Sequence, residues 1–261
     1  CGCCFIVFPP GAKQWKKDLL REKGVDVIEY QTDYSEAVRQ GRKLSDADPT
    51  SYFIDDENSV DLFMGYAVAA LRLRTQLSAH GVSVDAEHPL FVYLPCGVGG
   101  APGGITFGLK KLFGDAVHCF FVEPVNAPCM LAAFAKGECV PVAEFGLSGK
   151  TQADGLAVGC ASKLVFEAMR KTLDGEFTVS DGRLLPLLRL LNGSEGIFVE
   201  PSAAISAAAY MGMMGESCTD YLKKHGLDEK MSRAAHILWA TGGGLVPETE
   251  RNELCGTGAK R

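Results

Sequence analysis

The stretch Leu90-Phe-Val-Tyr-Leu-Pro-Cys-Gly-Val-Gly-Gly-Ala-Pro-Gly-Gly104 decides the fold of this chain. Its first half is a hydrophobic run with β-branched and aromatic members, which predicts a buried strand ending at Pro95. Five glycines follow within eight positions, and Ile105–Phe113 is expected to form a helix. Glycines allow successive N–H groups to converge, and a helix N-terminus adds partial positive charge. The pattern therefore indicates a site for a phosphorylated ligand.

Two common phosphate-binding motifs do not fit this loop. In a Gly-x-Gly-x-x-Gly dinucleotide fingerprint that starts at Gly97, Pro102 occupies the position of the third glycine. Gly149-Lys-Thr151 has the last letters of a P-loop, but Glu144 stands where the first glycine belongs. For the loop taken alone, a glycine-rich structural turn stays open as an alternative.

A second apolar stretch also runs into glycines, at His236-Ile-Leu-Trp-Ala-Thr-Gly-Gly-Gly244. Because predicted strands and helices alternate along the chain, we expect both loops at the carboxyl edge of one sheet, where open α/β folds bind ligands. The sequence therefore predicts an α/β fold, with a twisted, mostly parallel sheet and helices on both of its faces.

Composition excludes several classes of function. The 261 residues are 47% hydrophobic, which is enough for a sizeable core in one or two domains. The formal charge of −6 argues against nucleic-acid or anionic-membrane partners, and no apolar run approaches the roughly 20 residues of a membrane span. Ten cysteines, clustered only at positions 1, 3 and 4, and five scattered histidines indicate reduced thiols rather than a zinc site. We therefore expect a cytoplasmic protein.

Several blocks of this sequence closely resemble bacterial-type D-serine dehydratases. These are pyridoxal-phosphate (PLP) lyases of fold type II, the tryptophan-synthase-β class. The likeness extends from about Trp15 to the C-terminus, with the blocks in family order. The main blocks are Phe53-Ile-Asp-Asp-Glu-Asn-Ser59, Leu94-Pro-Cys-Gly-Val-Gly-Gly100, Ala153-Asp-Gly-Leu-Ala-Val-Gly159, Glu200-Pro-Ser-Ala203 and Trp239-Ala-Thr-Gly-Gly-Gly244.

The resemblance implies a two-domain enzyme and assigns cofactor contacts to two loops. Residues 1–59 would be a remnant of the smaller domain, and residues 60–261 an incomplete larger domain that binds the phosphate of PLP. Thr241 would place its hydroxyl against the pyridine nitrogen, although taken singly it could equally be a strand threonine beside a glycine turn. The amides expected to hold the 5′-phosphate are those of Gly97, Val98, Gly99, Gly100 and Ala101, the last replacing a glycine of the family.

A cation site is a further feature of related PLP dehydratases. They use an acidic residue at a strand end together with oxygens four and six positions further on. Here the acidic residue is Glu123, and the next two positions are Ala127, which offers only its carbonyl, and Cys129, a poor ligand for a hard cation. We therefore expect no metal.

The lysine that holds PLP as a Schiff base, and that moves the α-proton, is not found in this sequence. In the family it lies in a Ser-x-Lys-x-Arg-Gly-like segment, and Ser148-Gly-Lys150 shares only its spacing. We therefore expect a C-terminal portion that is inactive alone, with no catalytic residue of its own. The full-length parent is expected to be a monomer that converts D-serine to pyruvate and ammonia and binds no macromolecule.

Other functions stay open at this point. The parent could be a PLP lyase for L-serine, L-threonine or D-cysteine, because spacing does not determine the chirality of a substrate. The chain could also be a non-catalytic relic that kept a phosphate-binding loop after losing its lysine. A dinucleotide-binding protein is a third possibility, weakened by Pro102.

Overall fold

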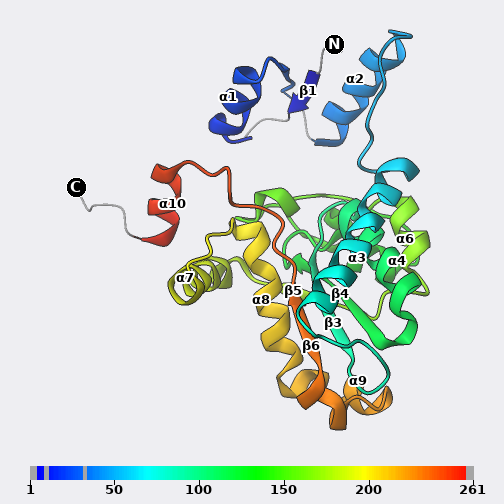
Figure 1. The fold of residues 1–261 in the computed structure, drawn as a ribbon. Helices are drawn as coiled ribbons and strands as arrows, with labels where there is room; N and C mark the ends of the chain where they lie inside the picture. The colour runs from blue at the N-terminus through cyan, green and yellow to red at the C-terminus, as the bar shows by residue number, and fades with distance from the viewer. Residues whose placement is uncertain (1–4, 9–11, 32–33, 257–261) are drawn as a thin grey trace. The chain divides into compact units, whose positions relative to one another are not determined.

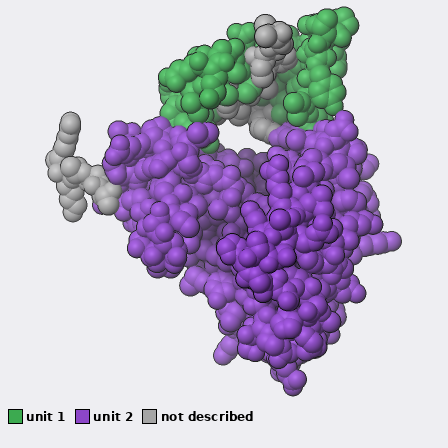
Figure 2. Space-filling model, in the orientation of Figure 1, with its two compact units in different colours: residues 1–55 green, residues 56–261 purple. Residues whose placement is uncertain are grey.

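The computed structural model describes residues 5–8, 12–31 and 34–256. It divides into two compact units, residues 1–55 and residues 56–261 (Figure 1, Figure 2). The pocket described below lies wholly in the second unit.

The first unit is a two-stranded parallel sheet with two helices. Its elements in chain order are β1 (Phe5–Phe8), α1 (Gln14–Glu22), β2 (Asp26–Glu29) and α2 (Tyr34–Asp46). Two cations of α1, Lys17 and Arg21, pair with Glu29 of β2, with nitrogen–oxygen distances of 2.6 and 2.9 Å. Ion pairs therefore attach α1 to the sheet in addition to packing.

The second unit contains a four-stranded sheet in the order β5-β4-β3-β6, in which every pair is parallel (Figure 1). Its strands are β3 (Leu90–Pro95), β4 (Val117–Pro124), β5 (Gly175–Val179) and β6 (Ala235–Leu238). All residues of β3 and β4 are buried, as is typical of central strands covered on both faces. The predicted parallel α/β sheet is confirmed.

Helices cover both faces of this sheet, because alternate strand residues point into two separate cores. Leu90, Val92 and Leu94 belong to the core formed with α3 to α6, whereas Phe91 and Tyr93 belong to the core formed with α7 and α8. The helices are α3 (Val60–Ala79), α4 (Gly100–Phe113), α5 (Cys129–Lys136), α6 (Lys163–Met169), α7 (Leu184–Glu195), α8 (Pro201–Met213), α9 (Thr219–Lys224) and α10 (Glu248–Cys255). Within the described part of the chain, none of the helices combines the length and the apolar character needed to cross a membrane.

The helix after the glycine loop begins earlier than the sequence suggests. We expected it at Ile105, but α4 begins at Gly100, so Gly103 and Gly104 are helical. The expectation was wrong because glycine has low intrinsic helix propensity and a run of glycines reads as a loop.

Close contact between α3 and α4 explains these helical glycines. A Cβ atom at Gly104 would lie 2.7 Å from the Cβ of Tyr66 and would collide with the carbonyl oxygen of Phe63. A Cβ at Gly108 would lie 2.9 Å from that of Ala70. The glycines therefore serve two purposes, since the first ones of the run form the loop and the later ones admit the backbone of α3.

Candidate functional site

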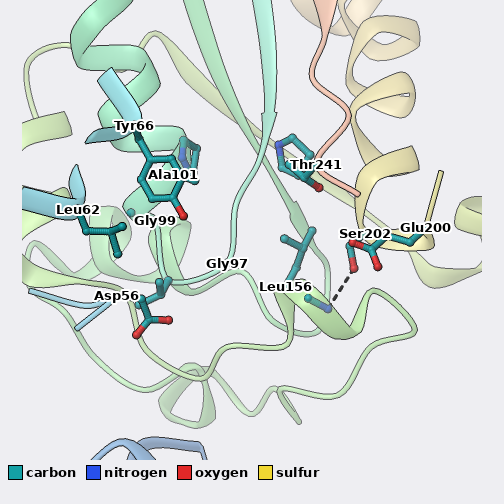
Figure 3. A pocket seen from close by; sticks show the side chains of 15 residues that line it. Asp56, Leu62, Tyr66, Gly97, Gly99, Ala101, Leu156, Glu200, Ser202 and Thr241 are labelled. Carbon is teal, nitrogen blue, oxygen red and sulfur yellow. Dashed lines mark hydrogen bonds between the residues drawn. The ribbon is translucent and has the colours of Figure 1, made fainter. Parts of the chain in front are cut away.

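A pocket of about 270 Å³ opens where β3 and β6 end (Figure 3). Its wall brings together loops that are distant in the sequence, and it includes all six residues assigned to the cofactor by the sequence analysis. The lining residues are Asp56, Leu62, Tyr66, Pro95, Gly97, Val98, Gly99, Gly100, Ala101, Pro102, Gly155, Leu156, Glu200, Ser202 and Thr241.

The loop between β3 and α4 exposes backbone N–H groups rather than side chains. Gly99 caps α4 with a φ of 110°, where an added Cβ would lie 2.8 Å from Cε of Met130. The amides of Gly100 and Ala101 follow in the first helical turn, which has no i−4 carbonyls to accept from it. Pro102 is tolerated in this first turn because an N–H at its position would have no carbonyl within the helix to donate to. Among the described residues only glycines have positive φ, so Ala101 fits without strain.

Two buried thiols fix the orientation of the peptide group between Gly97 and Val98. Cys129 and Cys96 both donate to the carbonyl of Gly97, with sulfur–oxygen distances of 3.2 and 3.4 Å. Because a planar trans peptide points its N–H opposite its carbonyl, the N–H of Val98 is directed away from these thiols. Burial raises the pKa of both cysteines well above the usual value, so they remain protonated donors.

On the far side of the pocket, Thr241 precedes a glycine turn that lies against the start of α8. The backbone N–H of Glu200 donates to the carbonyl of Gly242 at 3.1 Å. Gly243 has a φ of 135°, and a Cβ there would lie 2.7 Å from Cα of Val199. Only glycine allows so close an approach, and the contact holds Thr241 at the pocket.

The start of α8 also anchors the floor of the pocket. Ser202 is buried, and its hydroxyl accepts a hydrogen bond of 3.1 Å from the N–H of Gly155 (Figure 3). Gly155 belongs to a short 3-10 helix, Asp154–Leu156, which also supplies Leu156 to the wall. One serine thus joins two lining segments.

Asp56, Leu62 and Tyr66 form the wall opposite Thr241 (Figure 3). Leu62 and Tyr66 come from the first two turns of α3, whose N-cap Ser59 accepts from the N–H of Leu62 at 3.1 Å. This wall carries a carboxylate, an aliphatic side chain and a phenol, which suit a small polar ligand with an apolar ring.

The positive potential in the pocket comes from backbone dipoles, since no basic side chain lines it among the described residues. Of the described residues that line it, Asp56 and Glu200 are acidic and none is basic. Lys110, near the end of α4, pairs with Asp174 at 2.7 Å and donates to the carbonyl of Val117 at 2.6 Å. An anion at the glycine loop would therefore be held by N–H groups and the helix dipole.

Glu123 caps a helix in this structure. Its carboxylate is buried at the end of β4 and accepts from the N–H groups of Met130 and Leu131 at 2.8 and 2.9 Å, which caps α5. Burial raises its pKa, and the two amides oppose that shift. Ala127 is also buried, and the residues with described positions contain no cluster of three metal-ligating side chains.

Several residues that line the pocket had no predicted role. Three of them lie in blocks that resemble the family, namely Glu200, Ser202 and Gly155. Their place in these blocks was the one sequence feature that could have pointed to the site. Tyr66 has the spacing of a packing residue on α3, but it is 38% exposed and lines the pocket.

Comparisons with known proteins agree with this architecture. A family model described as pyridoxal-phosphate dependent enzyme matches residues 2–220. A relative from Halalkalibacterium halodurans, named probable D-serine dehydratase, is 56% identical over 241 residues, which is 92% of this chain and 54% of the relative. A Pseudomonas aeruginosa relative of the same name is 55% identical over 242 residues, or 92% and 54%. The chain thus spans about half the length of the curated relatives it matches.

Solved structures share the fold. The chain is similar to a fungal L-serine ammonia-lyase from Rhizomucor miehei, with a TM-score of 0.74 and 22% identity over 96% of this chain and 73% of that one. It is also similar to diaminopropionate ammonia lyase from Escherichia coli in complex with D-serine, with a TM-score of 0.78 and 21% identity over 98% and 64%. At these identities the likeness establishes the architecture of the sheet and its helices.

Proposed function

This chain belongs to the pyridoxal-phosphate-dependent enzyme family, and on that premise we propose that the whole protein converts D-serine to pyruvate and ammonia. The observation that carries the proposal is one pocket whose wall holds both the glycine loop and Thr241. The name shared by relatives at 55–56% identity, probable D-serine dehydratase, supports the choice of substrate.

The residues present fit a 5′-phosphate. Gly99, at a φ of 110°, turns the chain into α4 where a Cβ would collide with buried Met130, and the amides of Gly100 and Ala101 follow at the pocket wall. Amides and a helix N-terminus form a sufficient phosphate site without lysine or arginine. The amides of Gly97 and Val98 complete the proposed cradle.

Thr241 suits the far end of the cofactor ring. A hydroxyl can donate to or accept from a pyridine nitrogen, but it cannot hold that nitrogen protonated by charge pairing as an aspartate does. When bound, PLP supplies an electron sink that allows a proton to leave the α-carbon and a hydroxyl to leave the β-carbon. Thr241 would therefore leave the ring nitrogen uncharged, which would favour prompt loss of the β-hydroxyl.

We further propose that the wall formed by Asp56, Leu62 and Tyr66 faces the amino acid. Leu62 and the ring of Tyr66 would exclude water from the reacting carbons, and the Tyr66 hydroxyl would orient a polar group of the substrate. In this reading, residues 1–59 belong to the smaller domain of the whole enzyme and residues 60–261 to the larger one. The whole enzyme would act as a cytoplasmic monomer.

The 261 residues alone should release no pyruvate, because they contain no segment that resembles the family's lysine motif. The test joins this chain to the N-terminal half of the Halalkalibacterium halodurans relative and measures pyruvate from D-serine and from L-serine. Release from D-serine by the fusion, and none by the chain alone, would support the proposal. Release only from L-serine would instead favour an L-amino-acid lyase, and turnover by the chain alone would contradict its inactivity.

A further inference from the structure

Arg251 binds the glycine turn that follows Thr241. Its guanidinium comes from α10, outside the pocket wall, and donates from Nε to the carbonyl of Val246 at 2.7 Å. Its second terminal nitrogen donates to the carbonyls of Gly244 at 2.6 Å and Gly243 at 3.3 Å. One side chain therefore binds three carbonyls within four residues.

The same guanidinium also joins this turn to the segment that leads into α8. It lies over the ring of Phe198, 5.1 Å from the ring centroid. Two residues later, Glu200 donates its backbone N–H to Gly242. The turn is thus held both by the segment that leads into α8 and by Arg251.

We propose that Arg251 is a positioning residue, which fixes the turn after Thr241 and thereby places the Thr241 hydroxyl toward the ring nitrogen of the cofactor. This inference rests on the proposed function for the identity of the ring. The hydrogen bonds from Arg251 to the turn do not depend on that function. A planar fork with several fixed donors can satisfy three carbonyls at once, whereas a lysine ammonium concentrates its charge at one point.

A matched control is available on α7. Arg189 donates from Nε to the carbonyl of Leu254 at 2.8 Å, so it also holds α10, but at the end away from the turn. Arg189→Gln loosens the docking of α10 and leaves the three carbonyl contacts in place. Arg251→Gln removes these contacts, and Arg251→Lys keeps the charge without the fork.

The first test is amide hydrogen exchange of the chain without ligand. Arg251→Gln should speed exchange in residues 241–246 by roughly 10-fold or more and leave β3 and β4 unchanged. Arg251→Lys should rescue only part of the protection, and Arg189→Gln should match the parent in this segment. Wild-type protection in Arg251→Gln, or equal loss in Arg189→Gln, would overturn the proposal.

The second test is a double-mutant cycle with pyridoxal 5′-phosphate, followed by its absorbance spectrum and its Kd. If Arg251 acts through Thr241, then Arg251→Gln should weaken binding by roughly 5-fold in the parent and change nothing further in the Thr241→Ala background. Independent, additive effects would contradict the positioning role. A parent chain that binds no cofactor would count against the proposed function. The exchange experiment would still show whether Arg251 holds the turn.

Discussion

Glu176 lies on β5 with both carboxylate oxygens buried and, among the described residues, without a hydrogen-bond partner. It stands opposite Phe121 in the register of β4 and β5, on the same face as Glu123 two residues further along. Burial raises its pKa above the usual 4.5, and the nearby charge of Glu123 raises it further. Glu176→Gln, which keeps the shape and removes the charge, should therefore stabilise the folded chain.

The size of this effect follows from the protonation of the carboxyl group. A group with a raised folded-state pKa contributes stability below its unfolded pKa of 4.5, and this stability is lost as pH rises toward the folded value. Each pH unit in that window costs about 1.4 kcal/mol, so holding Glu176 neutral at pH 7 costs about 3 kcal/mol. Glu176→Gln should recover this energy, equivalent to roughly 6 to 12 °C in Tm for a unit of this size.

Urea unfolding at pH 4.5, 6 and 7 measures the prediction. The variant should come close to the parent at pH 4.5, where Glu176 is neutral in the folded chain, and should gain stability with each step upward. Glu167→Gln is the control, since Glu167 is half exposed and pairs with Arg170, the residue that caps the same helix. A gain at position 176 that does not change with pH would refute the argument from ionisation.

Three further substitutions test other parts of the account. Gly104→Ala should lower the free energy of unfolding by about 1 to 3 kcal/mol in urea, because its Cβ would press on Phe63 and Tyr66 of α3; an unchanged midpoint would contradict this. Gly99→Ala, at a φ of 110°, should weaken binding of pyridoxal 5′-phosphate by roughly 10-fold in a fluorescence titration; wild-type affinity would show that the loop does not need this conformation. Burial lowers the pKa of His236, so stability should fall as pH drops below its usual 6.5, and His236→Phe should flatten that slope in thermal melts.

The sheet and both loops of the site could be predicted from the sequence. The run Leu90–Pro95 is apolar throughout, as a strand buried on both faces must be, and the parallel order then brings its loop to the same edge as Thr241. β5 could not be predicted, since Gly175 and Glu176 break the apolar run that marks a strand.

Features that depend on tertiary contact could not be predicted. Gly103 and Gly104 look like loop residues until the backbone of α3 is placed beside them. Tyr66 has the spacing of a packing residue, and only the position of the pocket shows what it faces. Arg251 lies outside the matched blocks, and backbone carbonyls give no signal in the sequence that would pair them with it.

The central claim is that the amides of the glycine loop bind the phosphate of the cofactor, and glycine-selective ¹⁵N labelling tests it directly. Pyridoxal 5′-phosphate and pyridoxal, which lacks only the phosphate, are titrated into the labelled chain while the amide resonances of Gly97, Gly99 and Gly100 are followed. The phosphorylated ligand should move these three resonances, and pyridoxal should leave them in place. If pyridoxal moved them equally, or if the phosphorylated ligand bound without moving them, the loop would not be the phosphate site.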